Sequence, residues 1–531
     1  MFLAPALRAV KRTAGLVPGI RAFLSEPVTV ARAESEIRTA LGRREEHFLQ
    51  VVRTGVFDAP RSPYRPLFKW AGCEFADLEA GVRRDGLEST LEQLARNGVY
   101  LTSEEFKGKK PIIRGEHTMR VSPEDFLGLR SPSSIAINST GTMNQPIRSF
   151  VTLGWLAQRA LAMAVAFSAH DVLNHAHAIY DGILPSGGGV NNVLIYGRIG
   201  VPVARWFART VSADMWLKRR YYYLMTQAIT AASNRYGPGA SPPEFIDVED
   251  LQTIVHWILD THRGGRGCCI ATAASNAARI ARVAAELDLR LEGTTFIATG
   301  EPLTDAKRRA IEAVGATTFS RYAYGGGVNV GLGCADPRET DDVHVNEHLL
   351  VLIPRPTPIS PRGTPIYPLL CTTLHPSAPR LLINAESGDY GVLVRRECHC
   401  ALGRAGLTLH IHHIRSFEKF TSEGMNYSHW DLYRLLEEVL PSEFGGGPGD
   451  YQLVEEEDAR GQTLLTLRVA PAVGRLDEER LLARLREELA RESRGHRFMN
   501  AVWQQAGTLR IRREAPHASP RGKIVPLHIP S

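Results

Sequence analysis

The sequence lacks an apolar run long enough to cross a membrane. A membrane-spanning helix needs about 18 or more consecutive, predominantly apolar residues. The most apolar helical candidate covers residues 160–169, and polar or charged side chains flank it at Arg159, His170 and Asp171. We therefore expect a soluble chain without an integral membrane span.

Cysteine is scarce and scattered, with seven residues in 531. An odd number of dispersed cysteines does not suit a disulfide framework, so we expect reduced thiols and a cytoplasmic location. Cys398 and Cys400 form the tightest grouping. Thiolates at this spacing can bind Zn²⁺, with Cys334 or Cys371 as a third ligand. Reduced cysteines that only pack in the core are the alternative.

A strong excess of one charge is also missing. Lysine and arginine number 63 and aspartate and glutamate number 57, so the surplus is 63 − 57 = 6. In a chain of this length, such a surplus gives no indication of a nucleic-acid partner, and an anionic small molecule would suit it equally well. Hydrophobic residues make up 44% and charged residues 23%, which is typical of a globular protein.

The chain divides into three parts by pattern. Residues 1–30 contain several basic residues and no acid before Glu26, which predicts a loosely packed extension, with a targeting or membrane-surface segment as the alternative. Residues 31–414 alternate predicted strands and helices, which indicates a large α/β body of sheets flanked by helices. Residues 415–531 predict a small, mobile α+β domain, because short strands near 451 and 464–469 are followed by a leucine-rich amphipathic helix.

Within the body, short apolar runs precede helical patterns. A strand at 135–137 leads into a polar loop and then a helix at 153–167, a layout that would aim backbone N–H groups at a phosphate. Residues 270–287 also predict a helix. A second strand at 295–299 precedes a helix at 304–314, for which Thr304 is the expected N-cap. The triple glycine at 187–189 predicts a surface loop.

Polar and glycine-rich segments far apart in the sequence have the chemistry of a nucleotide site. They are Ser139-Thr140-Gly141-Thr142, Gly300-Glu301-Pro302, Tyr324-Gly325, Ser387-Gly388-Asp389 and Gly522-Lys523. Gly141 permits close backbone approach, and its hydroxyl neighbours can donate to phosphate. Tyr324 could stack on adenine, and Asp389 could accept both ribose hydroxyls. Taken singly, each segment also fits an ordinary turn, a buried strand tyrosine or an exposed tail lysine.

Taken together, these segments resemble the adenylate-forming superfamily, and within it the phenylacetate-CoA ligase-like group. The family's phosphate loop, Ser-Ser-Gly-Thr-Thr-Gly-x-Pro, is similar to residues 139–146, where Met143 and Asn144 replace a threonine and the second glycine. Its Gly-Gly-Glu-Pro and Tyr-Gly motifs are similar to residues 299–302 and 324–325.

The likeness continues to the far end of the chain. The family's Thr-Gly-Asp motif is similar to residues 387–389, and a Cys-x-Cys element followed by Gly-Arg, as in residues 398–404, is typical of the phenylacetate-CoA ligase-like branch. Residues 415–424 resemble the hinge into the mobile C-terminal domain. Lys523 falls where the family keeps its adenylation lysine. One departure is Val328, which stands where the family's Tyr-Gly-x-Thr-Glu motif has a Mg²⁺-binding glutamate.

The resemblance implies ATP-dependent activation of a carboxylic acid to an acyl-adenylate, followed by transfer to a thiol such as coenzyme A. Transfer to an amine or a protein is one alternative. A catalytically silent nucleotide- or acyl-binding protein is another, because Mg²⁺ lacks its usual ligand. The resemblance also implies a role for each segment. Phosphate would be bound by Ser139, Thr140, Gly141 and Thr142, adenine by Gly300, Glu301, Pro302, Tyr324 and Gly325, and ribose by Asp389, with a further ATP contact from Arg415. Lys523 would neutralise the developing charge, and the thiol step would take place at Gly424, Met425 and Asn426.

Overall fold

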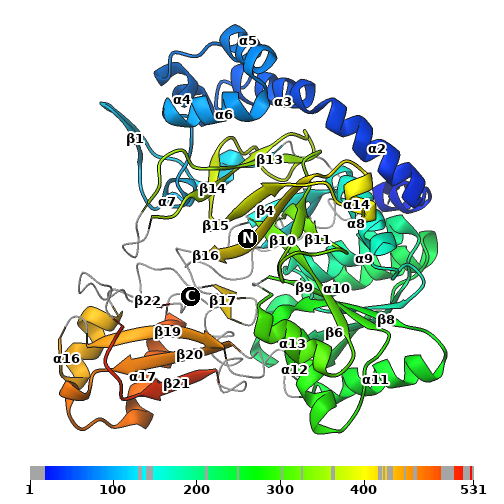
Figure 1. Cartoon of the computed structure of the whole chain (residues 1–531), viewed down its shortest axis with the longest axis vertical. Coiled ribbons are helices and arrows are strands. Elements are labelled where there is room, and N and C mark those ends of the chain that lie inside the picture. The colour runs from blue at the N-terminus through cyan, green and yellow to red at the C-terminus, as the bar shows by residue number, and fades with distance from the viewer. Residues whose placement is uncertain are drawn as a thin grey trace.

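The structure is a computed structural model that describes most of the chain. The described residues are 18–128, 134–138, 148–209, 213–247, 250–300, 303–324, 327–359, 365–416, 421–422, 425–426, 435–447, 450–457, 463–491, 508–517 and 527–528. They form a large body around one extended sheet and a smaller C-terminal unit with a sheet of its own (Figure 1). Among them, no helix is both long and apolar enough to cross a membrane.

A twelve-stranded sheet runs through the body. Its parallel half contains β5 (Ala176–Tyr180), β6 (Val203–Arg209), β7 (Pro243–Ile246), β8 (Cys268–Ala273), β9 (Thr294–Thr299) and β10 (Thr317–Tyr324). Its antiparallel half contains β11 (Val328–Gly333), β12 (Val343–Val345), β13 (Leu350–Pro354), β14 (Pro368–Thr373), β15 (Ala385–Arg395) and β16 (Leu409–Ser416). The strand order is β13-β14-β15-β16-β12-β11-β10-β9-β8-β5-β6-β7. Pairing changes at β10, which is parallel to β9 and antiparallel to β11.

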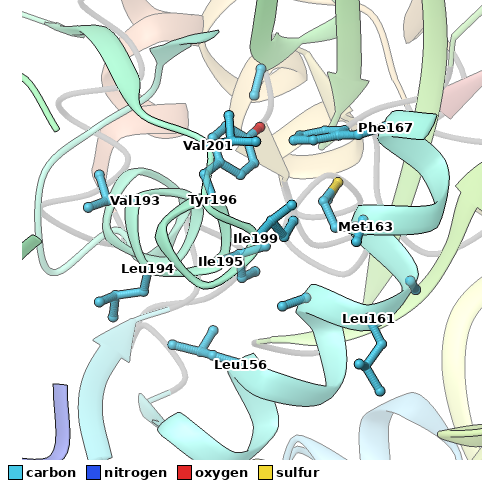
Figure 2. Packing of buried hydrophobic residues seen from close by; sticks show 14 of the residues in the cluster. Leu156, Leu161, Met163, Phe167, Val193, Leu194, Ile195, Tyr196, Ile199 and Val201 are labelled. Carbon is cyan, nitrogen blue, oxygen red and sulfur yellow. The ribbon is translucent and has the colours of Figure 1, made fainter. Parts of the chain in front are cut away.

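Helices cover this sheet (Figure 1). They are α8 (Leu153–Ala169), α9 (Gly187–Ile199), α10 (Ala213–Tyr236), α11 (Gln252–Arg263), α12 (Ala274–Glu286), α13 (Asp305–Ala313) and α14 (Ala401–Arg404). The helix predicted at 153–167 is confirmed as α8. It is apolar on nearly every side, as expected of a helix enclosed by other elements. The Phe167 ring packs against Tyr196 of α9, and Met163 belongs to the same hydrophobic cluster (Figure 2).

The N-terminal part is helical and packs on the body. It contains a helix at 18–24, α2 (Val30–Gly42), α3 (Arg44–Val52), a π-helical turn (Arg53–Phe57), α4 (Tyr64–Trp70), α5 (Phe75–Asp85), α6 (Leu87–Arg96), α7 (Ser103–Phe106), and the hairpin of β1 (Ile112–Arg114) and β2 (His117–Met119). The prediction of loose packing is wrong for residues 18–30, because Ile20, Leu24 and Val28 are buried in the core that contains α8 and α9. Residues 1–17 lie outside the described part.

Two further predictions for the body are wrong. Residues 270–273 belong to β8 rather than to a helix, because this stretch pairs with both β5 and β9; helix α12 begins only at Ala274. The triple glycine at 187–189 is the first turn of α9, not a surface loop. A Cβ on Gly189 would lie 2.0 Å from the Trp206 ring, so glycine is required there by close packing.

The C-terminal unit is a small α+β arrangement, as predicted. It contains a π-helical turn (Leu435–Val439), α16 (Leu440–Phe444), β19 (Tyr451–Glu457), β20 (Thr463–Val469), α17 (Glu478–Arg491), β21 (Leu509–Arg512) and β22 (Leu527–His528). The sheet has the order β21-β20-β19-β22. Leu481, Leu485 and Leu489 of α17 are buried in a core whose described members all come from the C-terminal unit. The unit therefore has its own hydrophobic core.

Candidate active site

The two segments predicted to hold adenine meet at one edge of the parallel sheet. Strands β9 and β10 run in register, with Thr299 opposite Arg321, so Gly300 follows β9 beside the last residues of β10. Gly300 has φ +83°, a conformation that favours glycine. Tyr324 ends β10 and is 8% exposed; its hydroxyl donates to the Glu386 carbonyl at 3.1 Å. Glu301, Pro302 and Gly325 lie outside the described residues.

The predicted ribose residue, Asp389, lies on β15 and is tied to the same edge. Tyr322, two residues before Tyr324, donates its hydroxyl to Asp389 Oδ2 at 2.9 Å. Burial, and then the negative charge of Asp389, hold the pKa of Tyr322 well above its ordinary value, so the phenol keeps its proton and acts as a donor. Residues 387–389 form part of a strand rather than the expected turn, although Gly388 has φ +81°.

Tyr322 was not among the predicted site residues. A signal was present, because Tyr322 and Tyr324 are separated by one residue on a strand that ends in glycines. Side chains at i and i+2 of a strand lie on the same face. Both hydroxyls indeed reach β15, one at Asp389 and the other at the Glu386 carbonyl.

The predicted phosphate loop, Ser139, Thr140, Gly141 and Thr142, lies outside the described residues, but the two strands that flank it are described. Strands β3 (Ser134–Asn138) and β4 (Arg148–Thr152) pair antiparallel, with Asn138 opposite Arg148. The loop therefore joins two strands, and the predicted direct connection to a helix is wrong, because residues 148–152 pair with β3 before α8 begins. A helix N-terminus directly after this loop cannot be part of a phosphate site.

This hairpin packs against the turn that follows Tyr324. A Cβ on Gly327 would lie 3.3 Å from Val151 and 3.8 Å from Ile137, one residue from each strand of the hairpin. The indole Nε1 of Trp155, at the start of α8, donates to the Gly327 carbonyl at 2.9 Å. The chain segments on either side of the predicted phosphate loop are thus fixed next to the Tyr324 turn.

Val328 is the residue that stands at the family's Mg²⁺ position. Its side chain is fully buried in an apolar cluster with Val330 and Val343, and it pairs with Tyr324 across the turn. The nearby carboxylate of Glu386 accepts from the Ser103 amide at 3.1 Å and forms an ion pair with Arg355 at 3.0 Å. Position 328 therefore offers no oxygen ligand for a hard cation.

Arg415 and the predicted thiol-step face lie beyond Asp389. Arg415, on β16, is opposite Tyr390 in the sheet, and its Nη1 pairs with Asp341 Oδ2 at 3.2 Å. The short strands β17 (Thr421–Ser422) and β18 (Met425–Asn426) pair with each other, and β17 contacts β20 of the C-terminal unit. Gly424 and Lys523 lie outside the described residues, so their roles stay predictions.

Three cysteines and one histidine form a second polar cluster, made of Cys334, His344, Cys398 and Cys400. All four ligand atoms lie within 4.8 Å of one another. Cys334 Sγ is 3.4 Å from Cys398 Sγ, and Cys400 Sγ is 3.1 Å from His344 Nε2. The His344 Nδ1 lies 2.7 Å from the Leu407 carbonyl, which orients Nε2 toward the sulfurs. The sequence prediction had named the three cysteines but not His344.

The geometry and donor set of this cluster suit Zn²⁺. Ligand atoms about 2.1–2.3 Å from a tetrahedral zinc are about 3.4–3.8 Å apart, close to the separations seen here. Hydrogen bonding from Cys334, and further from His344, holds the pKa of Cys400 far below its ordinary value, which gives that sulfur thiolate character. Four protein ligands would leave no open coordination position, as in structural zinc sites.

Substitutions at the Tyr322–Asp389 pair are expected to weaken ATP binding. Asp389→Asn removes the charge that would accept from ribose, and we expect KM for ATP to rise by about tenfold or more, with a smaller rise of about threefold for Tyr322→Phe. Steady-state pyrophosphate release with varied ATP gives both values. Tyr451→Phe is the matched control, because that hydroxyl donates to Gly445 in the C-terminal unit. An unchanged KM in Asp389→Asn would contradict the assignment.

No protein-family model and no curated protein matches the chain. Among solved structures, 2-hydroxyisobutyryl-CoA ligase in complex with 2-HIB-AMP and CoA is similar, with a TM-score of 0.50 and 17% identity over 95% of this chain and 91% of that one. The amide bond synthetase McbA from Marinactinospora thermotolerans has a TM-score of 0.39 and 12% identity to this chain. The match covers 95% of this chain and 97% of McbA. A double mutant of o-succinylbenzoate CoA synthetase from Bacillus subtilis has a TM-score of 0.35 and 11% identity to this chain. The match covers 73% of this chain and 94% of the synthetase. The first similarity confirms the predicted fold class, a sheet-based α/β body with a separate smaller unit.

Proposed function

We propose that this protein activates a carboxylic acid with ATP and passes the acyl group to a thiol, with coenzyme A as the acceptor. The observation that carries the proposal is the convergence of distant segments at one sheet edge. Gly300 follows β9, Tyr324 ends β10 and Asp389 lies on β15, and the hydroxyl of Tyr322 connects β10 to β15. The hairpin that bears the hydroxyl-rich loop packs against the same turn. Such an edge is where open α/β sheets bind ligands.

The proposed first step makes a poor electrophile reactive. A carboxylate oxygen attacks the α-phosphorus of ATP, the bond from that phosphorus to the bridging oxygen breaks, and pyrophosphate leaves. The residues near the sheet edge position ATP, while hydroxyls of the 139–142 loop donate to its phosphates and Lys523 neutralises the charge that develops between acid and phosphate. Mg²⁺ would need a ligand other than residue 328.

In the proposed second step, the thiolate sulfur attacks the acyl carbonyl and AMP leaves with the bonding electrons. We infer that the C-terminal domain, residues 415–531, turns near Arg415 so that Lys523 is replaced by the face that carries Met425 and Asn426. Within the superfamily, we assign the chain to the phenylacetate-CoA ligase-like branch, on the Cys398–Arg404 element. The solved structure with the 0.50 TM-score contains an acyl-AMP together with CoA, which supports both steps.

We also infer a structural Zn²⁺ held by Cys334, His344, Cys398 and Cys400. Cys334 follows the end of β11 opposite to Val328, about 20 Å along the strand at roughly 3.3 Å per residue. The metal would therefore link β11, β12 and the loop before α14 without taking part in the reaction.

A panel of aryl, indolyl and fatty acids tests the proposed function. Acid- and ATP-dependent release of pyrophosphate is expected with at least one class, and a thioester should form when coenzyme A is added. Pyrophosphate release without a thioester would indicate an amine or protein acceptor instead. The buried Val328 favours one other candidate, a silent nucleotide- or acyl-binding protein. Nucleotide binding without pyrophosphate release from any acid would favour that candidate and contradict the proposal.

A further inference from the structure

Two arginine side chains are buried beside the candidate active site. Arg159 lies on α8 and Arg321 on β10, and each is only 7% exposed. Within the described part of the chain, neither has a carboxylate at ion-pair distance, in contrast to the partly buried Arg355 and Arg396, which pair with Glu386 and Asp342. A buried charge without a counter-charge is strongly unfavourable. Arg159 and Arg321 therefore lack the carboxylate partner that Arg355 and Arg396 have.

Arg159 has the less satisfied environment of the two. It makes no hydrogen bond to any described residue, and of its three guanidinium nitrogens Nε alone is fully enclosed without a partner. Burial, and then the positive charge of Arg321, lower the pKa of Arg159 to about 9, so the two guanidinium groups are close enough to repel each other. Arg159 therefore stays charged at neutral pH, and its charge adds to that of Arg321 in one positive site.

Helix α9 adds two more unpartnered groups to this site. Asn192 Oδ1 accepts from Arg321 Nη1 at 2.7 Å, which leaves the buried Asn192 Nδ2 without a partner. Tyr196 follows one helical turn later on the same face, and its buried hydroxyl has no partner. Both arginine charges act on the pKa of Tyr196, which places the phenol near them. The unpartnered groups of this arginine cluster (Arg159, Arg321, Asn192 and Tyr196) are Arg159 Nε, Asn192 Nδ2 and the Tyr196 hydroxyl, and each of them can donate.

The arginine cluster lies next to the proposed ATP site, because Arg321 is on β10, the strand that ends at Tyr324. Arg321 is opposite Thr299, whose hydroxyl donates to the Arg321 carbonyl at 3.2 Å, and Gly300 follows directly. Tyr324 comes three residues later, about 10 Å along β10 at roughly 3.3 Å per residue. An acid whose carboxylate met the α-phosphate at this edge would extend its other end toward α8 and α9.

We propose that the arginine cluster binds an anionic group, and that this group is the second carboxylate of the acid that the protein activates. Guanidinium groups bind carboxylates through paired N–H donors, and Tyr196 and Asn192 supply further donors to the same oxygens. The substrate class is then dicarboxylic acids, one end of which is adenylated while the other is held by the cluster. The claim that a dicarboxylic acid is activated rests on the proposed function. The claim that the cluster binds an anion does not.

Matched acid pairs test the inference through kinetics. We expect wild-type protein to activate adipate in preference to hexanoate, or phthalate in preference to benzoate. Arg159→Met is expected to lower kcat/KM for the preferred diacid by roughly ten- to a hundredfold, with little change for its monoacid partner. Equal activation of diacids and monoacids, unaffected by Arg159→Met, would overturn the inference while the proposed function stands.

Thermal unfolding tests anion binding without any turnover. Diacid alone should raise Tm of the wild type and not of Arg159→Met. Without ligand, Arg159→Met should have a Tm equal to or above that of the wild type, because it removes an uncompensated buried charge. Asn192→Asp supplies an internal counter-charge, so it should raise Tm and abolish the shift caused by diacid. If no acid releases pyrophosphate, these shifts still decide whether the cluster binds an anion.

Arg198→Met is the control variant. Arg198 lies on α9 as well, but its Nη1 donates to the Phe23 carbonyl at 2.6 Å, so its loss should lower Tm and leave acid preference unchanged. A fall in Tm of Arg159→Met as large as that of Arg198→Met would show that protein groups already satisfy Arg159 and would overturn the proposal. Inorganic phosphate is the second probe: a shift with phosphate equal to that with diacid, without kinetic preference for diacids, would also overturn it.

Discussion

Replacing Lys523 by alanine is expected to lower acid-dependent pyrophosphate release by about a hundredfold or more. A positive charge aimed at the developing charge between carboxylate and α-phosphate acts only on the transition state, and removal of one such group costs on the order of a hundred- to a thousandfold in rate. Steady-state pyrophosphate release by wild-type protein and Lys523→Ala measures this effect.

The second half-reaction gives the control for Lys523. Acyl transfer to coenzyme A from acyl-adenylate supplied ready-made should remain near the wild-type rate in Lys523→Ala, because the lysine is assigned to the first step alone. Lys110→Ala should catalyse both half-reactions at the wild-type rate, since Lys110 pairs with Glu104 in the N-terminal part of the chain. Unchanged pyrophosphate release in Lys523→Ala would remove the role assigned to this residue.

Loss of the cysteine–histidine cluster is expected to have the largest effect on stability. Wild-type protein should contain about one zinc per chain, and Cys398→Ser or His344→Ala should contain almost none. Tm should fall by on the order of 10 °C, because a structural zinc stabilises its domain by several kcal/mol. Elemental analysis and thermal unfolding measure the two effects.

Cys371→Ala separates metal binding from the packing of a buried thiol. Cys371 is fully buried on β14 among apolar residues, so its replacement should cost some stability and leave the zinc content unchanged. Wild-type protein that was purified without zinc, and whose Tm did not respond to added zinc or to chelator, would contradict the inferred metal site.

Local patterns in the sequence predicted the elements around the site well. Thr304 was expected to cap a helix, and its side chain accepts from the Lys307 amide at 3.3 Å at the start of α13. The apolar run before Gly300 is strand β9, and the leucine spacing at 481–489 is that of α17. In these segments, the spacing of apolar residues and the residues that begin or end a helix agree with the tertiary packing.

Predictions failed where pairing or close packing overrides the local pattern. Residues 148–152 read as the approach to a helix, yet they pair with β3. Residues 270–273, Ile-Ala-Thr-Ala, fit a helix as well as a buried strand, and pairing with β5 and β9 makes them a strand. The glycines at 187–189 read as a loop because a single sequence does not show that Trp206 packs directly onto the backbone there.

Contacts between residues distant in sequence account for what the sequence could not show. His344 precedes Cys400 by 56 residues, and no spacing rule marks it as a ligand. Arg321 and Asn192 are 129 residues apart, so the charge of Arg321 could not be matched to its surroundings before the strands and helices were placed. In the sequence, Arg159 indicated only that the apolar run at residues 160–169 is too short to span a membrane. The structure shows that Arg159 is buried.

Exchange of labelled pyrophosphate into ATP tests the central claim most directly, because it reports reversible formation of an acyl-adenylate without any thiol. We predict exchange that depends on both ATP and a carboxylic acid in wild-type protein and that is reduced in Asp389→Asn. Absence of acid-dependent exchange across mono- and dicarboxylic acids, in protein shown to bind ATP, would contradict the claim.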